Sequence, residues 1–163
     1  MEHDKITIRY HSGIYTLESH QYLSINLEEA WSFFSDPSNL AKITPSSMGF
    51  DITSGKPGPM YEGQMISYKI GILPPFKSNW VTEITKIAEG SYFIDEQRAG
   101  PYLMWHHEHH FKPSGEGTAM YDKVSYRIPG GPIGHLAHSL FIRKKLMTIF
   151  SYRYDTMESY FNK

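Results

Sequence analysis

The feature that most constrains this fold is a series of short apolar runs followed by one long uninterrupted stretch. Between residues 48 and 129, runs rich in β-branched and aromatic residues alternate with clusters of Gly, Pro and Ser, which is typical of strands joined by turns. All connectors are of hairpin length, so neighbouring strands should pair antiparallel. The predicted strands are Met48–Ser54, Gly63–Ile72, Ser78–Ile87, Tyr92–Ala99, Tyr102–Lys112 and Thr118–Ile128.

A further strand and three helices complete the prediction. Residues 14–24 favour a seventh strand, and we expect residues 1–12 before it to fray. Asn26 with Glu29 forms a capping-box pattern that opens a short helix, and Pro37–Ile43 can supply a second one. Residues 133–161 contain no Pro, and no Gly after Gly134, so one long helix should close the chain.

Composition limits the kind of protein this is. With 163 residues and a formal net charge of −1, the chain fits a single domain spanning residues 1–163 and lacks the basic surface of a nucleic-acid binder. It has no cysteine, which excludes disulfides, thiolate metal sites and cysteine nucleophiles. The acidic N-terminus and the lack of a long apolar stretch predict a cytoplasmic protein without a membrane span, either a monomer or a homodimer.

The order of elements predicts an α+β helix-grip fold. A curved seven-stranded antiparallel sheet, with two short helices after its first strand, would wrap around the long C-terminal helix. Such a grip leaves a gap between sheet and helix, and an empty gap is costly, so it should hold water or a ligand. The 12 Tyr, 9 Phe, 3 Trp and 9 His residues suit its lining, because each Tyr, Trp or His adds a polar tip to an apolar body.

Several motifs carry a resemblance to a known family, and they extend over nearly the whole chain. The chain resembles bacterial SRPBCC ligand-binding proteins of the START/Bet v 1-like, polyketide cyclase superfamily. The resemblance implies a helix-grip fold with an apolar ligand cavity. It leaves the ligand open, because members bind lipids, hormones or polyketides and many do so without catalysis. The motifs are Gly100–Phe111, Gly117-Thr118, Asp122–Tyr126 and Pro129–Gly134, supported by Phe33–Pro37, Thr44-Pro45 and Ile149–Arg153.

Alternation along one strand defines the candidate site. Residues at odd positions from 103 to 111 share one face, which is the more apolar one and is assigned to the cavity. If residues 114–117 form the hairpin loop, the register places His109 opposite Asp122, His107 opposite Val124 and Trp105 opposite Tyr126. The residues predicted to contact a ligand are Tyr68, Trp80, Leu103, Trp105, His107, His109 and Tyr126.

Two functions follow from this constellation. The favoured one is noncatalytic binding of a small, largely apolar or amphipathic molecule, because a buried carboxylate and imidazole commonly satisfy each other. The alternative is an enzyme of the polyketide cyclase or dehydratase type, in which His109 and Asp122 move a proton and Tyr126 stabilises an enolate. A third possibility is a regulatory role in which a ligand moves loops around Pro57 and Pro74.

Metal binding is the remaining alternative. The His-x-His spacing can place His107 and His109 on one ion, with Asp122 as a third ligand and His135 or His138 as a fourth. The opposite face of the same strand also carries histidines, so the run is not specific for metal. We therefore expect neither a metal nor another cofactor.

Overall fold

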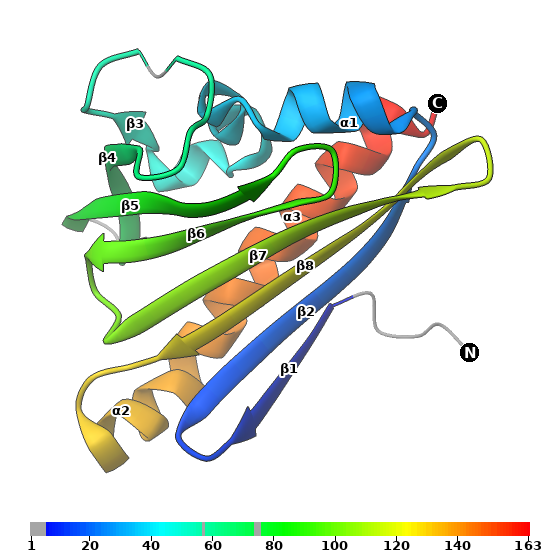
Figure 1. The fold of residues 1–163 in the computed structure, drawn as a ribbon. Coiled ribbons are helices and arrows are strands. Elements are labelled where there is room, and N and C mark those ends of the chain that lie inside the picture. The colour runs from blue at the N-terminus through cyan, green and yellow to red at the C-terminus, as the bar shows by residue number, and fades with distance from the viewer. Residues whose placement is uncertain (1–5, 57, 74–75) are drawn as a thin grey trace.

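The computed structural model describes residues 6–56, 58–73 and 76–163 and, for residues 72, 73 and 76, the backbone only. The loop positions Pro57 and Pro74 and the N-terminal residues 1–5 lie outside the described residues. One antiparallel sheet of eight strands, in the order β1-β2-β8-β7-β6-β5-β4-β3, curves across a long C-terminal helix, α3 (Figure 1). The strands are β1 Ile6–His11, β2 Ile14–Leu23, β3 Asp51–Ile52, β4 Met65–Leu73, β5 Phe76–Ala88, β6 Tyr92–Ala99, β7 Met104–Ser114 and β8 Gly117–Arg127.

The eighth strand corrects the sequence prediction. Residues expected to fray instead form β1, which pairs with β2 over its whole length from Ile6↔Ser19 to His11↔Ile14. Its connection to β2 is a two-residue turn in which Ser12 and Gly13 both have positive φ, at 51° and 85°. That turn matches the twist of the flanking strands. A Ser-Gly pair between alternating residues was therefore a hairpin signal that the prediction missed.

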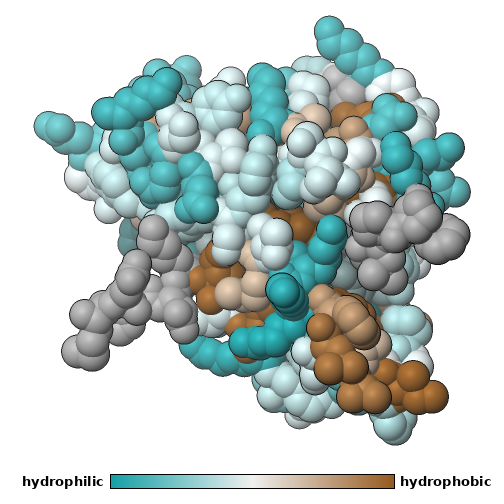
Figure 2. Space-filling model, turned by 180° about the vertical axis from the view of Figure 1, so that it is seen from behind, coloured by the Kyte–Doolittle hydropathy of each residue, from teal (hydrophilic) through white to brown (hydrophobic). Residues whose placement is uncertain are grey.

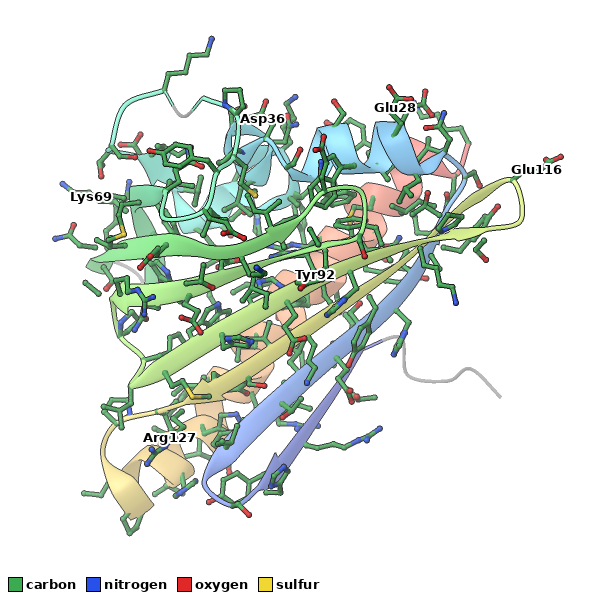
Figure 3. All side chains as sticks on the ribbon, in the orientation of Figure 1. Glu28, Asp36, Lys69, Tyr92, Glu116 and Arg127 are labelled. Atoms are coloured by element: carbon green, nitrogen blue, oxygen red, sulfur yellow. The ribbon has the colours of Figure 1, made fainter. Side chains whose placement is uncertain are left out.

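The hairpin of β7 and β8 confirms the predicted register. Trp105 pairs with Tyr126, His107 with Val124 and His109 with Asp122. Figure 3 shows Glu116 at the tip of this hairpin and Arg127 at the far end of β8. The strand β7 begins two residues later than predicted, because the amide of Gln97 binds both the N–H and the carbonyl of Tyr102 and holds the chain in a loop there.

Three short helical segments follow β2 and cover one end of the sheet. The predicted capping box opens α1: the Asn26 side chain accepts from the Glu29 N–H, and the Glu29 carboxylate accepts from the Asn26 N–H. The second segment is capped by Asp36, which accepts from the Ser38 N–H. Ala30 and Phe34 are the buried residues of the first helix. The segments are α1 Leu27–Phe34, the 3₁₀ helix η1 Pro37–Ile43 and the 3₁₀ turn η2 Ser46–Met48.

The C-terminal helix runs over residues 131–161 but is not uniform. It consists of α2 Gly131–Ala137, a π-helical turn η3 His138–Ile142 and α3 Arg143–Phe161. A side chain at Gly134 would meet the carbonyl oxygen of Pro129 at 2.1 Å, so only glycine lets this helix start so close to the end of β8. No helix in the described part of the chain is both long and apolar enough to cross a membrane.

Buried side chains form three clusters between sheet and helices. One joins β1, β2 and β8 to α3, a second joins α1 and η1 to β6, β7 and β8, and a third lies on β4 and β5. Seen from the helix side, apolar side chains gather over α2 and η3, where Ile133, Leu136, Leu140 and Phe141 are exposed (Figure 2). The three buried clusters meet around a space between the sheet and α3.

Candidate functional site

A cavity of about 160 Å³ lies between the inner face of the sheet and α3. Its wall takes side chains from all three buried clusters, including Phe34 from the second, Trp80 from the third and Phe150 from the first. Most of the wall is aliphatic or aromatic. Apart from Asp36 at the start of η1, its charged and titratable side chains gather on β6, β7 and α3, and the chemistry of the cavity depends on them.

Two histidines from β7 form the centre of the polar wall. His107 and His109 are 5% and 7% exposed, and their rings lie with centroids 3.7 Å apart at a tilt of 35°. Behind them, away from the cavity lining, Asp122 of β8 contacts both: His107 donates from Nε2 to Asp122 Oδ1 at 3.3 Å, and His109 Nδ1 lies 2.9 Å from the same oxygen. The His109 contact is an ion pair, because its alignment is too poor for a hydrogen bond.

A second carboxylate, Asp95 of β6, contacts the same histidines from the cavity side. His109 donates from Nε2 to Asp95 Oδ2 at 2.8 Å, and His107 Nδ1 lies 3.7 Å from that oxygen. The two imidazoles are thus held between two carboxylates, one lining the cavity and one behind. We call Asp95, His107, His109 and Asp122 the His–Asp cluster.

Burial and mutual contacts shift the pKa values of these four groups in different directions. Burial opposes ionisation of Asp122, but contacts from His107 and His109 outweigh it and hold the pKa of Asp122 below its usual value. Burial likewise opposes ionisation of Asp95, but a hydrogen bond from His109 and the nearby positive charges outweigh it and lower the pKa of Asp95. Burial lowers the pKa of His107, helped by the charge of His109. Burial acts the same way on His109, but its two carboxylate partners prevail and raise its pKa, so His109 holds a proton more readily than His107 does.

Arg153 of α3 adds a buried positive charge to the cavity wall, which also includes Lys145 of the same helix. It is 8% exposed, and its guanidinium lies over the Phe150 ring at 5.1 Å from the centroid. Its Nε atom is buried and has no hydrogen-bond partner among the described residues. Buried polar atoms are rarely left without a partner in folded proteins. Arg153 thus brings an unpaired donor to a side chain that lines the cavity.

The rest of the wall is an aromatic surface on β4, β5 and β7. Trp80 donates from Nε1 to Thr82 Oγ1 at 3.0 Å, and the Tyr68 hydroxyl lies 3.3 Å from the same oxygen. Tyr68 stacks on Trp80 with ring centroids 6.0 Å apart, and Trp105 meets Trp80 edge-on at 5.3 Å. Thr82 thus fixes the orientation of two large rings, which gives the cavity a rigid apolar side.

The structure divides the residues predicted to contact a ligand into two groups. Tyr68, Trp80, Trp105, His107 and His109 all line the cavity. Leu103 and Tyr126, although both are in the described part of the chain, do not line it.

Each of those two differences has a local cause. Leu103 precedes β7 in the loop held by Gln97 and is 63% exposed, so placing it in the cavity wall was wrong. Tyr126 is fully buried, but its hydroxyl bonds to His138 Nε2 at 2.7 Å instead of facing the cavity. His135 likewise binds the Tyr15 hydroxyl, at 2.6 Å. His135 and His138 are thus engaged in a separate cluster at the start of the long helix.

Sequence reasoning missed Asp95 and Arg153. Asp95 shares a strand face with Phe93, yet a single acidic residue in an alternating strand is more often solvent-facing, so the sequence carried little warning. Arg153 carried a clearer signal: it falls in the helical stripe formed by the buried residues Leu146, Phe150 and Met157. A lone charged residue in an apolar stripe is informative, because arginine is seldom buried without a partner.

Comparison with known proteins supports the fold. No protein-family model matches the chain, and no curated protein is significantly similar to it. Solved structures are similar: TTHA0849 from Thermus thermophilus has a TM-score of 0.66 at 15% identity, over 88% of this chain and 94% of that one. The KanY protein (ms6282) has a TM-score of 0.66 at 14% identity, and the match covers 88% of this chain and 94% of that one.

An allergen has a similar architecture. Ara h 8.0201, a Bet v 1 allergen, is similar with a TM-score of 0.61 at 13% identity, and the match covers 90% of this chain and 99% of that one. At such identities the likeness concerns the backbone arrangement alone. The chain therefore has a Bet v 1-like helix-grip fold, with eight strands in its sheet.

Proposed function

We propose that this protein binds a small, largely apolar molecule in the cavity between the sheet and α3, with an oxygen-bearing group of that molecule held by Arg153. The observation that carries the proposal is a buried arginine on an apolar cavity wall whose Nε has no partner among the described residues. The ligand would be a carboxylate or carbonyl compound with a ring or short hydrocarbon body.

The size and lining of the cavity support the apolar part. A dry cavity of this kind costs about 24 cal/mol per Å³, so 160 Å³ left empty would cost about 4 kcal/mol. Cavities of about 150 Å³ with apolar walls accept molecules the size of benzene. Filling the space with a matching ring recovers contacts that Tyr68, Trp80 and Ile84 now lack.

The charges on the cavity wall support the proposal that the ligand carries a polar group. The His–Asp cluster carries two carboxylates, and the positive charges beside them come from Arg153 and, when it is protonated, from His109. Asp95 and Asp122 already interact with the two histidines, so their acceptors are engaged, whereas the Arg153 donor is not. An added carbonyl or carboxylate oxygen would complete the hydrogen bonding of Arg153. Hydrogen bonds to a charged donor contribute about 1.5–3 kcal/mol.

Calorimetric titration with two probes of one shape tests this function. The probes 4-methylbenzoate and p-xylene share the ring and differ by the carboxylate. We expect the carboxylate to bind about 10-fold or more tightly, and Arg153→Met to remove that advantage while p-xylene still binds. Arg9→Met, which changes an exposed arginine on β1, is the matched control. Absence of binding for both probes would refute the proposal, and an unchanged preference in Arg153→Met would refute the role of Arg153.

The alternative function, acid–base catalysis on the bound molecule, is favoured by one observation. His109 lines the cavity while held between Asp95 and Asp122, which is the kind of environment that adjusts an imidazole for proton transfer. The sequence suggested Tyr126 as the hydroxyl that stabilises an enolate, but Tyr126 bonds to His138. In the structure, the hydroxyl on the cavity wall that could take this role is that of Tyr68.

Proton abstraction can be measured without knowing the substrate. In D₂O, the acetyl protons of 4-methylacetophenone exchange slowly, and their loss is followed by NMR. A catalytic His109 would accelerate this exchange, and His109→Gln would return it to the buffer rate while leaving p-xylene binding intact. Exchange at the buffer rate in the unaltered protein would leave binding as the sole function.

A further inference from the structure

Three side chains of the His–Asp cluster present their donor atoms to one point on the cavity wall. One donor atom each from Asp95, His107 and His109 lies within 4.8 Å of the other two. The atoms that face one another are Asp95 Oδ2, His109 Nε2 at 2.8 Å from it and His107 Nδ1 at 3.7 Å from it. A tetrahedral ion with bonds of about 2.1 Å needs donors about 3.4 Å apart, so shifts of less than about 1 Å suffice.

The remaining nitrogens are held as metal-binding histidines require. A ligating imidazole usually directs its other nitrogen to a carboxylate or carbonyl, which fixes its orientation. Here His107 Nε2 and His109 Nδ1 both contact Asp122 Oδ1, at 3.3 and 2.9 Å. Asp122 is 3% exposed and does not line the cavity, so it sits behind both rings. One carboxylate thus orients two candidate ligands at once.

We propose that Asp95, His107 and His109 bind one divalent first-row transition-metal ion, with Asp122 as the residue that positions both histidines. This changes the ligand set considered from the sequence, because Asp122 moves from ligand to positioning residue and Asp95 takes its place. Two imidazoles and one carboxylate suit zinc, cobalt, nickel or iron(II) rather than magnesium or calcium. On binding, the ion displaces the proton that His109 shares with Asp95.

An ion at this point keeps an open side toward the cavity. Asp95, His107 and His109 all line the cavity, so the coordination position not filled by protein faces the space where a molecule would sit. With both imidazoles neutral, the ion, Arg153 and the two carboxylates carry one net positive charge. A carboxylate-bearing molecule would neutralise it, although the metal site itself does not depend on such a molecule.

Cobalt titration tests the site directly. Protein purified without a histidine tag and stripped with chelator should bind one equivalent of Co²⁺, with visible absorption bands of four- or five-coordinate cobalt. Binding should release about one proton and raise the melting temperature. Zn²⁺ should displace the cobalt signal. If the folded protein takes up no cobalt at about 100 μM, or gives only the spectrum of the hydrated ion, the proposal is overturned.

Matched variants locate the bound ion. Asp95→Asn and His109→Gln should each weaken Co²⁺ binding by about 100-fold or more, and Asp122→Asn by about 10- to 100-fold. His106→Gln and His110→Gln are controls from the same strand, on the face marked by Tyr92 in Figure 3, where the Tyr92 and His110 rings stack at 5.5 Å. Affinity lost in the controls but kept in Asp95→Asn would place the ion on the outer face and refute the site.

If a variant fails to fold, the unaltered protein still decides the question. Co²⁺ stoichiometry, absorption and proton release are measured on it without substitution. Failure of 4-methylbenzoate and p-xylene to bind would leave these readouts unaffected, so the metal proposal and the proposed function fail separately.

Discussion

Two buried histidine clusters lie between the sheet and the C-terminal helix, and they differ in their partners. In the His–Asp cluster, His107 and His109 are held by Asp95 and Asp122. In the second cluster, which we call the tyrosine cluster, His138 shares a hydrogen bond with the Tyr126 hydroxyl, and its ring stacks on that of Tyr15 with centroids 3.6 Å apart. The first cluster lines the cavity, whereas the second packs solidly against the sheet.

The difference shows how partner chemistry separates a site from a structural contact. Tyrosine hydroxyls satisfy a neutral imidazole, and burial lowers the pKa of His138 to about 4, so His138 stays uncharged near neutral pH. Carboxylates instead stabilise a buried imidazolium and retain oxygens that face a cavity. We therefore place the chemistry at the His–Asp cluster and assign the tyrosine cluster to anchoring the helix.

The largest expected effect on stability distinguishes the buried carboxylate of Asp122 from an outer one, that of Glu108. Asp122→Asn removes a buried charge that stabilises His109, so the free energy of unfolding in chelator should fall by about 3 kcal/mol. Glu108→Gln, on the outer face of β7 beside Lys123 and His110, should cost less than about 1 kcal/mol. Urea denaturation of both variants checks the contrast. Equal losses would show that burial does not distinguish these carboxylates.

Acid should affect the tyrosine cluster through His138. Burial, with the positive charge of Arg143 and with His135 nearby, lowers its pKa to about 4, while Tyr15 and Tyr126 face it from the sheet without adding negative charge. The unfolded chain then binds more protons than the folded one between about pH 6.5 and 4. Stability contributed by neutral His138 should fall by about 2 kcal/mol as pH drops through that window.

Comparison with His138→Gln isolates this contribution. The difference in unfolding free energy between about pH 7 and about pH 4.5 should be smaller in the variant than in the unaltered protein. An identical pH dependence would mean that the pKa of His138 is the same in the folded and unfolded states, and the contrast between the two clusters would collapse.

A smaller effect tests the tyrosine partner itself. Tyr126→Phe keeps the buried ring but leaves His138 Nε2 without its 2.7 Å partner, so unfolding free energy should fall by about 1–2 kcal/mol. Tyr61→Phe, at a tyrosine that is 61% exposed, is the control and should change stability by less than about 0.5 kcal/mol. Ligand and cobalt binding should survive in both, because neither residue lines the cavity.

Much of the fold could be predicted because local signals agreed with one another. The Asn26–Glu29 capping box, the short turns from β5 to β6 and from β7 to β8, and the helix over the long stretch without Pro all appear in the structure, whereas β3 and β4 are joined by the longer segment 53–64. Counting outward from Ser114 and Gly117 placed His109 opposite Asp122, because a strand alternates faces and one hairpin turn fixes the register.

The remainder depended on contacts distant in sequence. Leu103 alternates correctly with Trp105, but the Gln97 amide ends the strand before it reaches the sheet. Asp95 meets His109 only because β6 pairs with β7, and the loop between these strands is too irregular for its sequence to fix their register. The π turn at His138–Ile142 has no local sequence cause that we can identify.

A crystal structure with 4-methylbenzoate bound tests the central claim most directly. We predict the ring between Tyr68, Trp80 and Phe150, with a carboxylate oxygen about 3 Å from the Arg153 guanidinium. A ring bound outside the cavity would contradict the claim. So would a carboxylate that points away from Arg153, with protein side chains filling the space beside the guanidinium.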